Sequence, residues 1–572
     1  MKLKRLTALI LCLALVLSLA ACGGDGGQSS SSGSSSGSAP EESSASTPEE
    51  SGDGASAPEE SGTSASGIQG ADWFEGRDFS EHYTISLASV QIEDARDYNK
   101  GDDWVSQWTE KFNIEWEITP LTFENWGERL RIWINSDDMP DMAVYNYNNA
   151  EAVNYADQGL VKMLPEDWKT AYPNLAAAQE KVPISSLAED TMGGTFYLFR
   201  PAYSNHRPAD KMANHMSVYM RKDWGAAVDV EVKPAMKVSE IIEYARKVKE
   251  KNPGNVEGDF YPIVNTSGRL ARFVQANNTY AGLDDLPFYK GDDGKYHWGP
   301  ADESTLEALK MLNQAYKDGL IDPEFYTIQD MDDYGAFRTS GISAVCDSEA
   351  VISQIDTYDK EMAASLGVNF EEAVEIVTPL GEDGYFHANT YGNYWGTNIF
   401  SPHIDEGKFE RVLSMMDYSC TDLGQYEIRC GIQDVDWTYD ESTGEITSTL
   451  KEGEDLWTKY ALLPVYVNMM VLSDDFGFVN PIYKQSLRDK ATQLHVLHAE
   501  QSTEESFPSE IDWNVALHDS QALNLATMTY ADEYAALIVK EGDIETNWKA
   551  WVNEKMPMIQ PVLDELDAGA GN

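Results

Sequence analysis

Short apolar runs that alternate with amphipathic helical patterns constrain the fold of this chain more than any other feature. Strands are expected over residues 82–90, 113–120 and 142–145, with helices between them over 103–112 and 124–135. Strands separated by helices favour parallel pairing within one sheet that those helices cover. The pattern therefore predicts an α/β fold.

The same alternation continues along the rest of the chain. Helices are expected over 238–251 and 304–318, a strand over 341–346, and a helical region over 521–566. No motif recurs at a fixed period, so a solenoid is excluded. The region 69–572 is long enough for two domains or two large lobes.

Residues 1–21 are typical of a secretory signal peptide. An apolar stretch over residues 6–19 follows three basic residues, Lys2, Lys4 and Arg5. This stretch is short for a transmembrane helix, which needs about 20 apolar residues. We therefore expect export of the protein and removal of the segment.

The tetrapeptide Leu19-Ala20-Ala21-Cys22 resembles the bacterial lipobox. The resemblance implies cleavage before Cys22, attachment of acyl chains such as palmitate to Cys22, and a lipoprotein anchored at the extracellular face of the cell membrane. Several acyl chains on one residue suffice for stable anchoring. The alternative is an ordinary secreted protein in which Cys22 carries no lipid.

A tract rich in Ser, Gly, Pro and Glu follows over residues 22–68. It contains no Lys or Arg, and near-repeats lie at 39–43, 47–51 and 57–61. Such a composition buries too little apolar surface to offset the entropy of ordering, which predicts a disordered linker. A flexible coil of this length spans roughly 35 to 40 Å on average, enough to tether a folded domain.

The charge of the chain restricts its ligand classes. The formal net charge is −54, from 42 Lys and Arg against 96 Asp and Glu. Long-range repulsion disfavours nucleic acids, anionic lipid headgroups and polyanionic substrates as partners. Neutral or cationic ligands are favoured.

The expected folded region contains three cysteines, Cys346, Cys420 and Cys430. An oxidising exterior permits a disulfide between Cys420 and Cys430, which would leave one thiol unpaired. The alternative is that all three are small buried apolar residues. In both cases the fold does not depend on a disulfide scaffold.

A series of motifs resembles the family 1 extracellular solute-binding proteins of bacterial ABC importers. They are Ser136–Met142, Tyr155–Val161, Gly194–Tyr197, Tyr219–Trp224, Tyr316–Phe325 and Gly431–Trp437. Most of the matched residues have structural roles; Gly159 and Gly319, for example, stand where left-handed helix caps are expected. The order of the motifs along residues 80–565 carries the resemblance.

The resemblance implies a two-lobed, type II periplasmic-binding-protein-like fold whose lobes are joined by crossing hinge strands. Lobe 1 would comprise residues 77–195 and 390–430, and lobe 2 residues 200–385 and 432–572. A hinge motion would bury a ligand between the lobes. The implied function is not enzymatic: a monomer captures a sugar or oligosaccharide and delivers it to the transmembrane subunits of an ABC permease.

Candidate ligand contacts follow the strand expected at 142–145. Open α/β sheets bind ligands at the carboxyl ends of their strands, and sugar sites combine aromatic rings with polar side chains. In similar sugar-binding proteins this position supplies a stacking ring and a polar partner, which the resemblance carries over to Tyr145 and Asn148, with Tyr147 beside them. The alternative is a polar loop with one buried tyrosine.

Other candidates lie further along the chain. The resemblance implies that a second crossing strand falls near residues 382–395. Tyr391 and Trp395 belong to it and stand next to glycines, and hinge packing is the alternative role. In the family pattern the loop after the strand expected at 341–346 points toward the cleft, so the resemblance makes Glu349 a candidate acceptor. Three further candidates, for which a salt bridge or a core position is the alternative role, are Arg200, Arg269 and Trp437.

No cofactor or catalytic metal is expected. Calcium is an alternative at residues 252–259, a loop placed like the calcium loops of similar proteins, although it is short and poor in Asp. The sequence contains no HExxH, GxSxG or P-loop motif. His495 and His498 can share one face of a helix, and we expect that face to be solvated.

Alternative functions use different chemistry. A peptide- or cation-binding lipoprotein of the same fold would line its site with carboxylates and few exposed rings. A surface glycoside hydrolase needs two paired carboxylates, which 96 acidic residues can supply in many combinations. A non-transporting adhesin is a further alternative.

Overall fold

The computed structural model describes most of the region expected to fold, namely residues 67–90, 103–122, 125–202, 206–213, 216–283, 287–328, 332–390, 392–451, 454, 456–460, 463 and 474–569. The expected signal peptide, Cys22, nearly all of the linker and Tyr391 lie outside these residues. The chain divides into two units, 1–63 and 64–572, and every element below belongs to the second.

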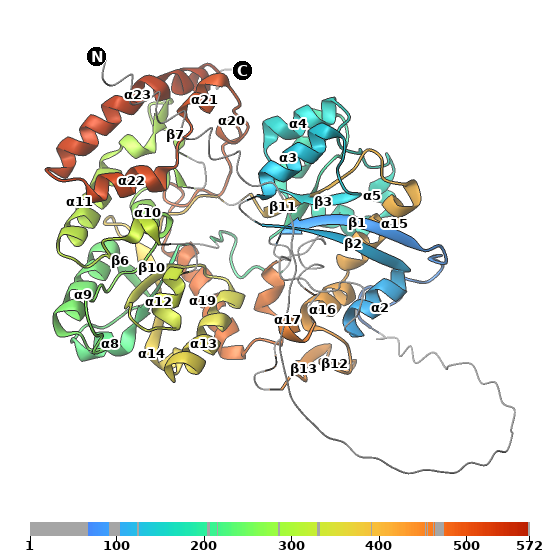
Figure 1. Cartoon of the computed structure of the whole chain (residues 1–572), viewed down its shortest axis with the longest axis horizontal. Helices are drawn as coiled ribbons and strands as arrows, with labels where there is room; N and C mark the ends of the chain where they lie inside the picture. The colour runs from blue at the N-terminus through green and yellow to red at the C-terminus, as the bar shows by residue number, and fades with distance from the viewer. Residues whose placement is uncertain are drawn as a thin grey trace, which may run out of the picture. The chain divides into compact units, whose positions relative to one another are not determined.

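The first sheet has the strand order β2-β1-β3-β11-β4. Figure 1 labels β1, β2, β3 and β11 of this sheet. Its strands are β1 (Tyr83–Val90), β2 (Ile114–Leu121), β3 (Met142–Tyr145), β4 (Leu198–Pro201) and β11 (Tyr394–Phe400). β1 is parallel to β2 and β3, whereas β11 is antiparallel to β3 and β4. The strands of a second sheet lie between β4 and β11 in the sequence, so the first sheet combines strands from two distant parts of the chain.

Helices connect and cover these strands to form the first lobe. They are α2 (Asp103–Phe112), α3 (Trp126–Ser136), α4 (Asn149–Asp157), α5 (Trp168–Ala171), α6 (Pro173–Gln179), α7 (Pro183–Met192), α15 (Glu406–Ser419), α16 (Asp422–Cys430) and α17 (Leu456–Lys459). A hairpin of β12 (Trp437–Asp440) and β13 (Glu445–Ser448) follows α16. Ile432, Leu456 and Tyr460 join the hydrophobic cluster that contains Ile85 and Leu87 of β1, so the chain after α16 still packs in this lobe.

The second sheet has the order β6-β10-β5-β9. Its strands are β5 (Ser217–Arg221), β6 (Ala235–Lys237), β9 (Val345–Ser348) and β10 (Val374–Leu380). β5 is antiparallel to both β9 and β10, while β6 is parallel to β10. We call this sheet and its helices the second lobe.

The second lobe is rich in helices. They are α8 (Lys222–Ala227), α9 (Val238–Lys251), α10 (Ser267–Gln275), α11 (Glu303–Lys317), α12 (Asp332–Arg338), α13 (Ile352–Leu366), α14 (Phe370–Ala373) and α19 (Gln485–Glu500), followed by α20 (Trp513–Ala516), α21 (Gln521–Ala526), α22 (Tyr530–Val539) and α23 (Ile544–Gly569). The short elements are the hairpin β7 (Phe288–Lys290) and β8 (Tyr296–Trp298), and the 3₁₀ turns η2 (Gly299–Ala301), η3 (Phe325–Thr327) and η4 (Asp474–Phe478).

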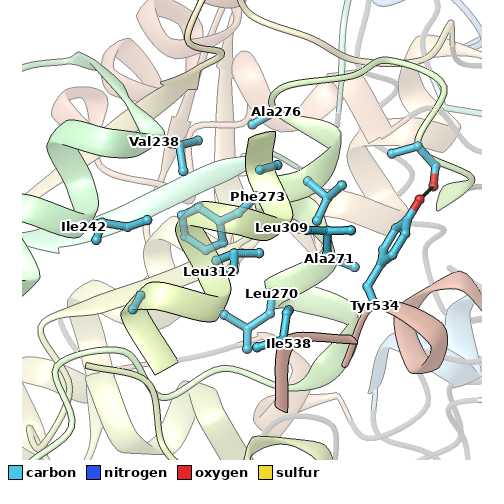
Figure 2. Packing of buried hydrophobic residues seen from close by; sticks show 14 of the residues in the cluster. Val238, Ile242, Leu270, Ala271, Phe273, Ala276, Leu309, Leu312, Tyr534 and Ile538 are labelled. Atoms are coloured by element: carbon cyan, nitrogen blue, oxygen red, sulfur yellow. Dashed lines mark hydrogen bonds between the residues drawn. The ribbon is translucent and has the colours of Figure 1, made fainter. Parts of the chain in front are cut away.

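Figure 2 shows how the C-terminal helices complete the core of the second lobe. Phe273 of α10 and Leu312 of α11 pack in one cluster with Ile538 of α22, and all three are buried. Tyr534 of α22 donates its hydroxyl hydrogen to the carbonyl oxygen of Ala281 at 2.5 Å. Helices that are far apart in the sequence therefore share one core.

Residues just after the expected linker pack into the first lobe. Ile68 is buried in a cluster with Cys430 and Trp437. Trp73 is buried as well, and its indole Nε1–H donates to Oδ2 of Asp417 at 2.7 Å. Ile68, which the expected boundary assigns to the linker, thus packs with the first lobe.

Most of the expected elements are confirmed. The helices over 103–112 and 238–251 have the predicted bounds, and the first three strands lie within one or two residues of theirs. The strand expected at 341–346 starts later, at Val345. Its first residues instead close the end of α12, since Ile342 and Ser343 donate backbone hydrogen bonds to the carbonyl oxygen of Ala336.

Among the described residues, Cys346, Cys420 and Cys430 form no disulfide with one another, so the alternative of a Cys420–Cys430 disulfide is not realised. Burial raises the pKa of all three thiols. None of the helices in the described part of the chain combines the length and the apolar character that a membrane crossing requires.

Candidate ligand-binding site

Several candidate residues meet at one edge of the first sheet. β3 and β4 run in the same direction and β11 runs against both, so the carboxyl ends of β3 and β4 lie beside the amino end of β11. This places Tyr147 and Asn148, Arg200, and Trp395 at a single edge of the sheet. Because open α/β sheets bind ligands at such an edge, we call these residues, with Trp126 and Tyr394, the aromatic edge.

Ring contacts hold the aromatic edge together. The ring of Tyr147 lies 4.9 Å from Phe199 and 6.4 Å from Tyr394, measured between ring centroids. Burial raises the pKa of the Tyr147 and Tyr394 hydroxyls, so both tyrosines remain neutral hydrogen-bond donors at physiological pH.

Trp395 is the most accessible ring of this group. Its side chain is 36% exposed, whereas Trp126 is 7% exposed. The two rings are 5.9 Å apart between centroids, and the guanidinium of Arg200 lies 4.8 Å from the Trp395 centroid. Trp126 is itself held by a hydrogen bond from its Nε1–H to the carbonyl oxygen of Val144 at 2.7 Å. Trp395 thus presents a supported aromatic surface to solvent.

Two candidates beside β3 have structural roles. Tyr145 is 3% exposed and donates its hydroxyl hydrogen to Glu151 at 3.2 Å, so its ring is part of the core and not a stacking surface. This is the buried tyrosine that the alternative interpretation expects. Asn148 is the N-cap of α4, where its Oδ1 accepts a hydrogen bond from the backbone N–H of Glu151 at 3.1 Å.

A second group of candidates lies at the end of β9. Glu349 is the first residue after this strand and is half-buried. Its Oε2 accepts a hydrogen bond from the hydroxyl of Tyr334 at 3.0 Å, and its backbone oxygen accepts one from Tyr219 at 2.9 Å. Burial raises the pKa of the Tyr334 hydroxyl, which keeps it protonated as a donor.

Arg269 belongs to this second group through an ion pair. Its Nε lies 2.9 Å from Oδ2 of Asp333, which is completely buried, and its guanidinium lies 3.8 Å from the centroid of the Tyr334 ring. The nearby carboxyl of Asp347 is buried, which raises its pKa to about 7. The salt bridge that was the alternative role for Arg269 is therefore present.

The remaining candidates do not join either group. Trp437 is fully buried, packs on Tyr426 and donates its Nε1–H to the carbonyl oxygen of Gly431 at 3.0 Å, so it has the core position that was its alternative role. Tyr391 lies outside the described residues. Sequence reasoning missed Trp126, Tyr394 and Tyr334; Tyr394 stood in the motif around Trp395 and could have been found there.

The loop considered for calcium is closed by its own hydrogen bonds. The side chain of Asn252 bonds to the backbone of Val256 in both directions, at 2.9 Å each. Within the described part of the chain, no group of three or more His, Cys, Asp or Glu residues is arranged to hold a metal ion.

Comparison with known proteins gives one relative by sequence. The chain is 22% identical over 316 residues to FusA, the fructooligosaccharide ABC transporter substrate-binding protein of Streptococcus pneumoniae serotype 4. The match covers 50% of this chain and 57% of FusA, so the chain spans little more than half the length of this relative. No protein-family model matches the chain.

Solved structures match over a larger part of the chain. The alginate-binding protein AlgQ2, solved without calcium ion, superposes with a TM-score of 0.62 and 13% identity over 86% of this chain and 99% of its own. FusA in complex with kestose superposes with a TM-score of 0.60 and 16% identity over 85% and 99%. The chain has the fold of ABC-transporter substrate-binding proteins.

A third neighbour supports the same fold. An HMO-binding, ABC-transporter-associated solute-binding protein from Bifidobacterium longum infantis superposes with a TM-score of 0.60 and 15% identity over 86% of this chain and 98% of its own. The expected α/β solute-binding fold, with two lobes, is thereby confirmed.

Proposed function

We propose that this protein is the solute-binding component of an ABC importer and that it captures a sugar or oligosaccharide between its two lobes. The observation that carries the proposal is the aromatic edge, where Trp395 offers an accessible ring beside Arg200, and the adjacent Tyr394 contacts Tyr147. Pyranose and furanose rings expose apolar C–H faces that pack on aromatic side chains, while their hydroxyls need polar partners. The edge supplies both kinds of group.

The chemistry of the second group fits the same ligand class. Glu349 lies at the end of β9, which is the position in an open sheet where ligands bind. Arg269 of α10 contacts the ring of Tyr334, whose hydroxyl donates to Glu349. The strongly negative chain favours a neutral solute over an anionic one. FusA, the relative named for fructooligosaccharides, adds support for an oligosaccharide.

The proposal includes location and mode of action. We propose that lipid on Cys22 holds the protein at the extracellular face of the cell membrane, with the linker as its tether to an importer. The protein would bind its solute without converting it and hand it to the permease as a monomer. Neither a metal nor a cofactor is needed for these steps.

A thermal-shift screen tests the function. The chain from residue 22 with Cys22→Ala is heated with neutral oligosaccharides, including kestose, and with acidic glycans, peptides and polyamines. A ligand present at 100 times its Kd stabilises the native state by about 2.7 kcal/mol, which raises the unfolding temperature measurably. We expect the shift with one or more neutral oligosaccharides.

Other outcomes would point elsewhere. A shift with peptides or polyamines and none with glycans would contradict the sugar proposal and favour the peptide- or cation-binding alternative. Release of shortened glycans from the mixture, measured by mass spectrometry, would show a hydrolase. Purified protein with no ligand-dependent shift in any class would contradict the solute-binding proposal itself.

A further inference from the structure

The second lobe contains a chain of contacts that ends on Glu349. Asp333 is completely buried, and its Oδ2 accepts a hydrogen bond from the backbone N–H of Thr266 at 3.1 Å while pairing with Arg269. Arg269 in turn lies against the face of the Tyr334 ring. Tyr334 then donates its hydroxyl hydrogen to Glu349. A fully buried anion therefore fixes a cation, a ring and finally a carboxylate at the end of β9.

This arrangement leaves Tyr334 very little freedom. The ring is fully buried, with Arg269 at 3.8 Å and Arg338 at 5.3 Å from its centroid. Cation–π contacts and burial hold the ring, so its hydroxyl has a defined direction. By contrast, Glu349 is half-buried and reaches solvent.

The hydrogen bond from Tyr334 occupies one position of the Glu349 carboxylate. An ionised carboxylate has two oxygens and about four acceptor positions, so it can also accept hydrogen bonds from the hydroxyls of a ligand. Such charge-assisted bonds are roughly twice as strong as neutral ones, and they are strongest when the acceptor is already oriented.

We propose that Tyr334 is a positioning residue that orients Glu349 to accept hydrogen bonds from ligand hydroxyls, and that the Asp333–Arg269 pair holds Tyr334 in place. This inference rests on the proposed function. It assigns to the second lobe an oriented acceptor, which would favour ligands with a donor at that point and disfavour ligands that carry a carboxylate there.

The experiment measures the Kd of the full mature chain carrying Cys22→Ala for kestose, or for the tightest neutral oligosaccharide of the screen if kestose does not bind. Tyr334→Phe removes only the hydroxyl and should weaken binding about threefold to tenfold, the loss expected for one hydrogen bond. Tyr358→Phe is the matched control. Tyr358 is buried, its ring centroid lies 6.0 Å from that of Tyr334, and its own hydroxyl lies 3.4 Å from Cys346 Sγ. This control should change Kd less than twofold.

A double-mutant comparison separates positioning from a general structural effect. In a Glu349→Ala background, Tyr334→Phe should cause less than a twofold further loss of affinity, because the carboxylate that it orients is absent. If Tyr334 had only a general structural role, Tyr334→Phe would lower affinity by the same factor in both backgrounds. Tyr358→Phe would then cause a similar loss of affinity.

Three results would overturn the inference. They are an unchanged Kd for Tyr334→Phe, an equal loss in the two backgrounds, and an equal loss for the control. Failure of the wild-type protein to bind any oligosaccharide would instead overturn the proposed function, and this inference with it.

Discussion

The guanidinium of Arg200 lies 4.8 Å from the centroid of the Trp395 ring, although the two residues belong to different strands, β4 and β11. Arg200 is 7% exposed and Trp395 is 36% exposed. A buried cation therefore supports one side of an accessible ring, and this pairing requires both strands to be in place.

Replacing Trp395 with alanine should weaken oligosaccharide binding about tenfold or more, because the substitution removes the accessible ring of the aromatic edge. Trp395→Phe should keep part of the affinity. The loss is measured by isothermal titration with the tightest oligosaccharide of the screen.

Trp133→Ala is the matched control for this change. Trp133 is half-buried on α3, seven residues after Trp126, and the guanidinium of Arg129 lies 4.7 Å from its ring centroid. Its loss should leave Kd within about twofold. Equal effects of the two substitutions would argue against a stacking role for Trp395.

Replacing Asp417 with alanine should lower the free energy of unfolding by about 3 kcal/mol, since a buried carboxylate that receives several hydrogen bonds is removed. Asp417 is fully buried and accepts from Trp73 Nε1 at 2.7 Å and from the backbone N–H groups of Asn174 and Leu175 at 2.8 and 3.0 Å. Urea denaturation measures the change.

Asp422→Asn provides the comparison, because Asp422 is an exposed residue in the first turn of the neighbouring α16. It should cost less than about 0.5 kcal/mol. A small effect of Asp417→Ala would mean that residues 67–77 contribute little to the first lobe.

Stability should fall as the pH drops from about 6.5 toward 4, because two histidines are buried in neutral form. Burial lowers the pKa of His495 to about 4 and holds that of His498 well below its ordinary value. The unfolded chain binds protons at these sites below its ordinary pKa of about 6.5 while the folded chain does not, so acid favours unfolding. For His495 alone, the free energy of unfolding should fall by about 3 kcal/mol over this pH range.

His498→Phe tests this prediction, since His498 is stacked on Phe386 at 4.1 Å and a phenyl ring can replace it there. The variant should lose part of the decline in stability between pH 6.5 and 4. Asp347 gives the opposite pH dependence. Burial raises the pKa of its carboxyl to about 7, so its contribution to the free energy of unfolding is lost as the pH rises. Asp347 is present in both proteins, so its effect cancels when the pH profile of the unfolding free energy of wild type is subtracted from that of the variant. Identical profiles for the two proteins would contradict the prediction.

Substituting Cys22 with alanine should move the protein from the membrane fraction to the medium while Kd stays the same. Acylation of one residue anchors a protein without contributing to a distant site. Cell fractionation with immunoblotting measures the location, and titration measures the binding. A variant that stays with the membrane would argue against lipid attachment at Cys22.

The buried histidines show where local reasoning failed. His495 and His498 were expected on a solvated helix face, but both are completely buried. α19 packs against α13, β10 and η4, which covers more of the helix than its own sequence pattern indicates. Neither ring nitrogen of His498 has a hydrogen-bond partner among the described residues. The polar character of histidine therefore led to a wrong prediction of exposure for both residues.

The sequence by itself determined the secondary structure, the α/β class and the edge that follows β3, because apolar periodicity and chain direction are local properties. It also supplied Trp395, Arg200 and Glu349 as candidates. Only the tertiary structure decided their partners and their exposure. Arg200 meets Trp395 because two strands distant in the chain pair, and Tyr334 meets Glu349 because α12 packs beside β9, the next element of the chain. Tertiary packing also made Tyr145 and Trp437 core residues.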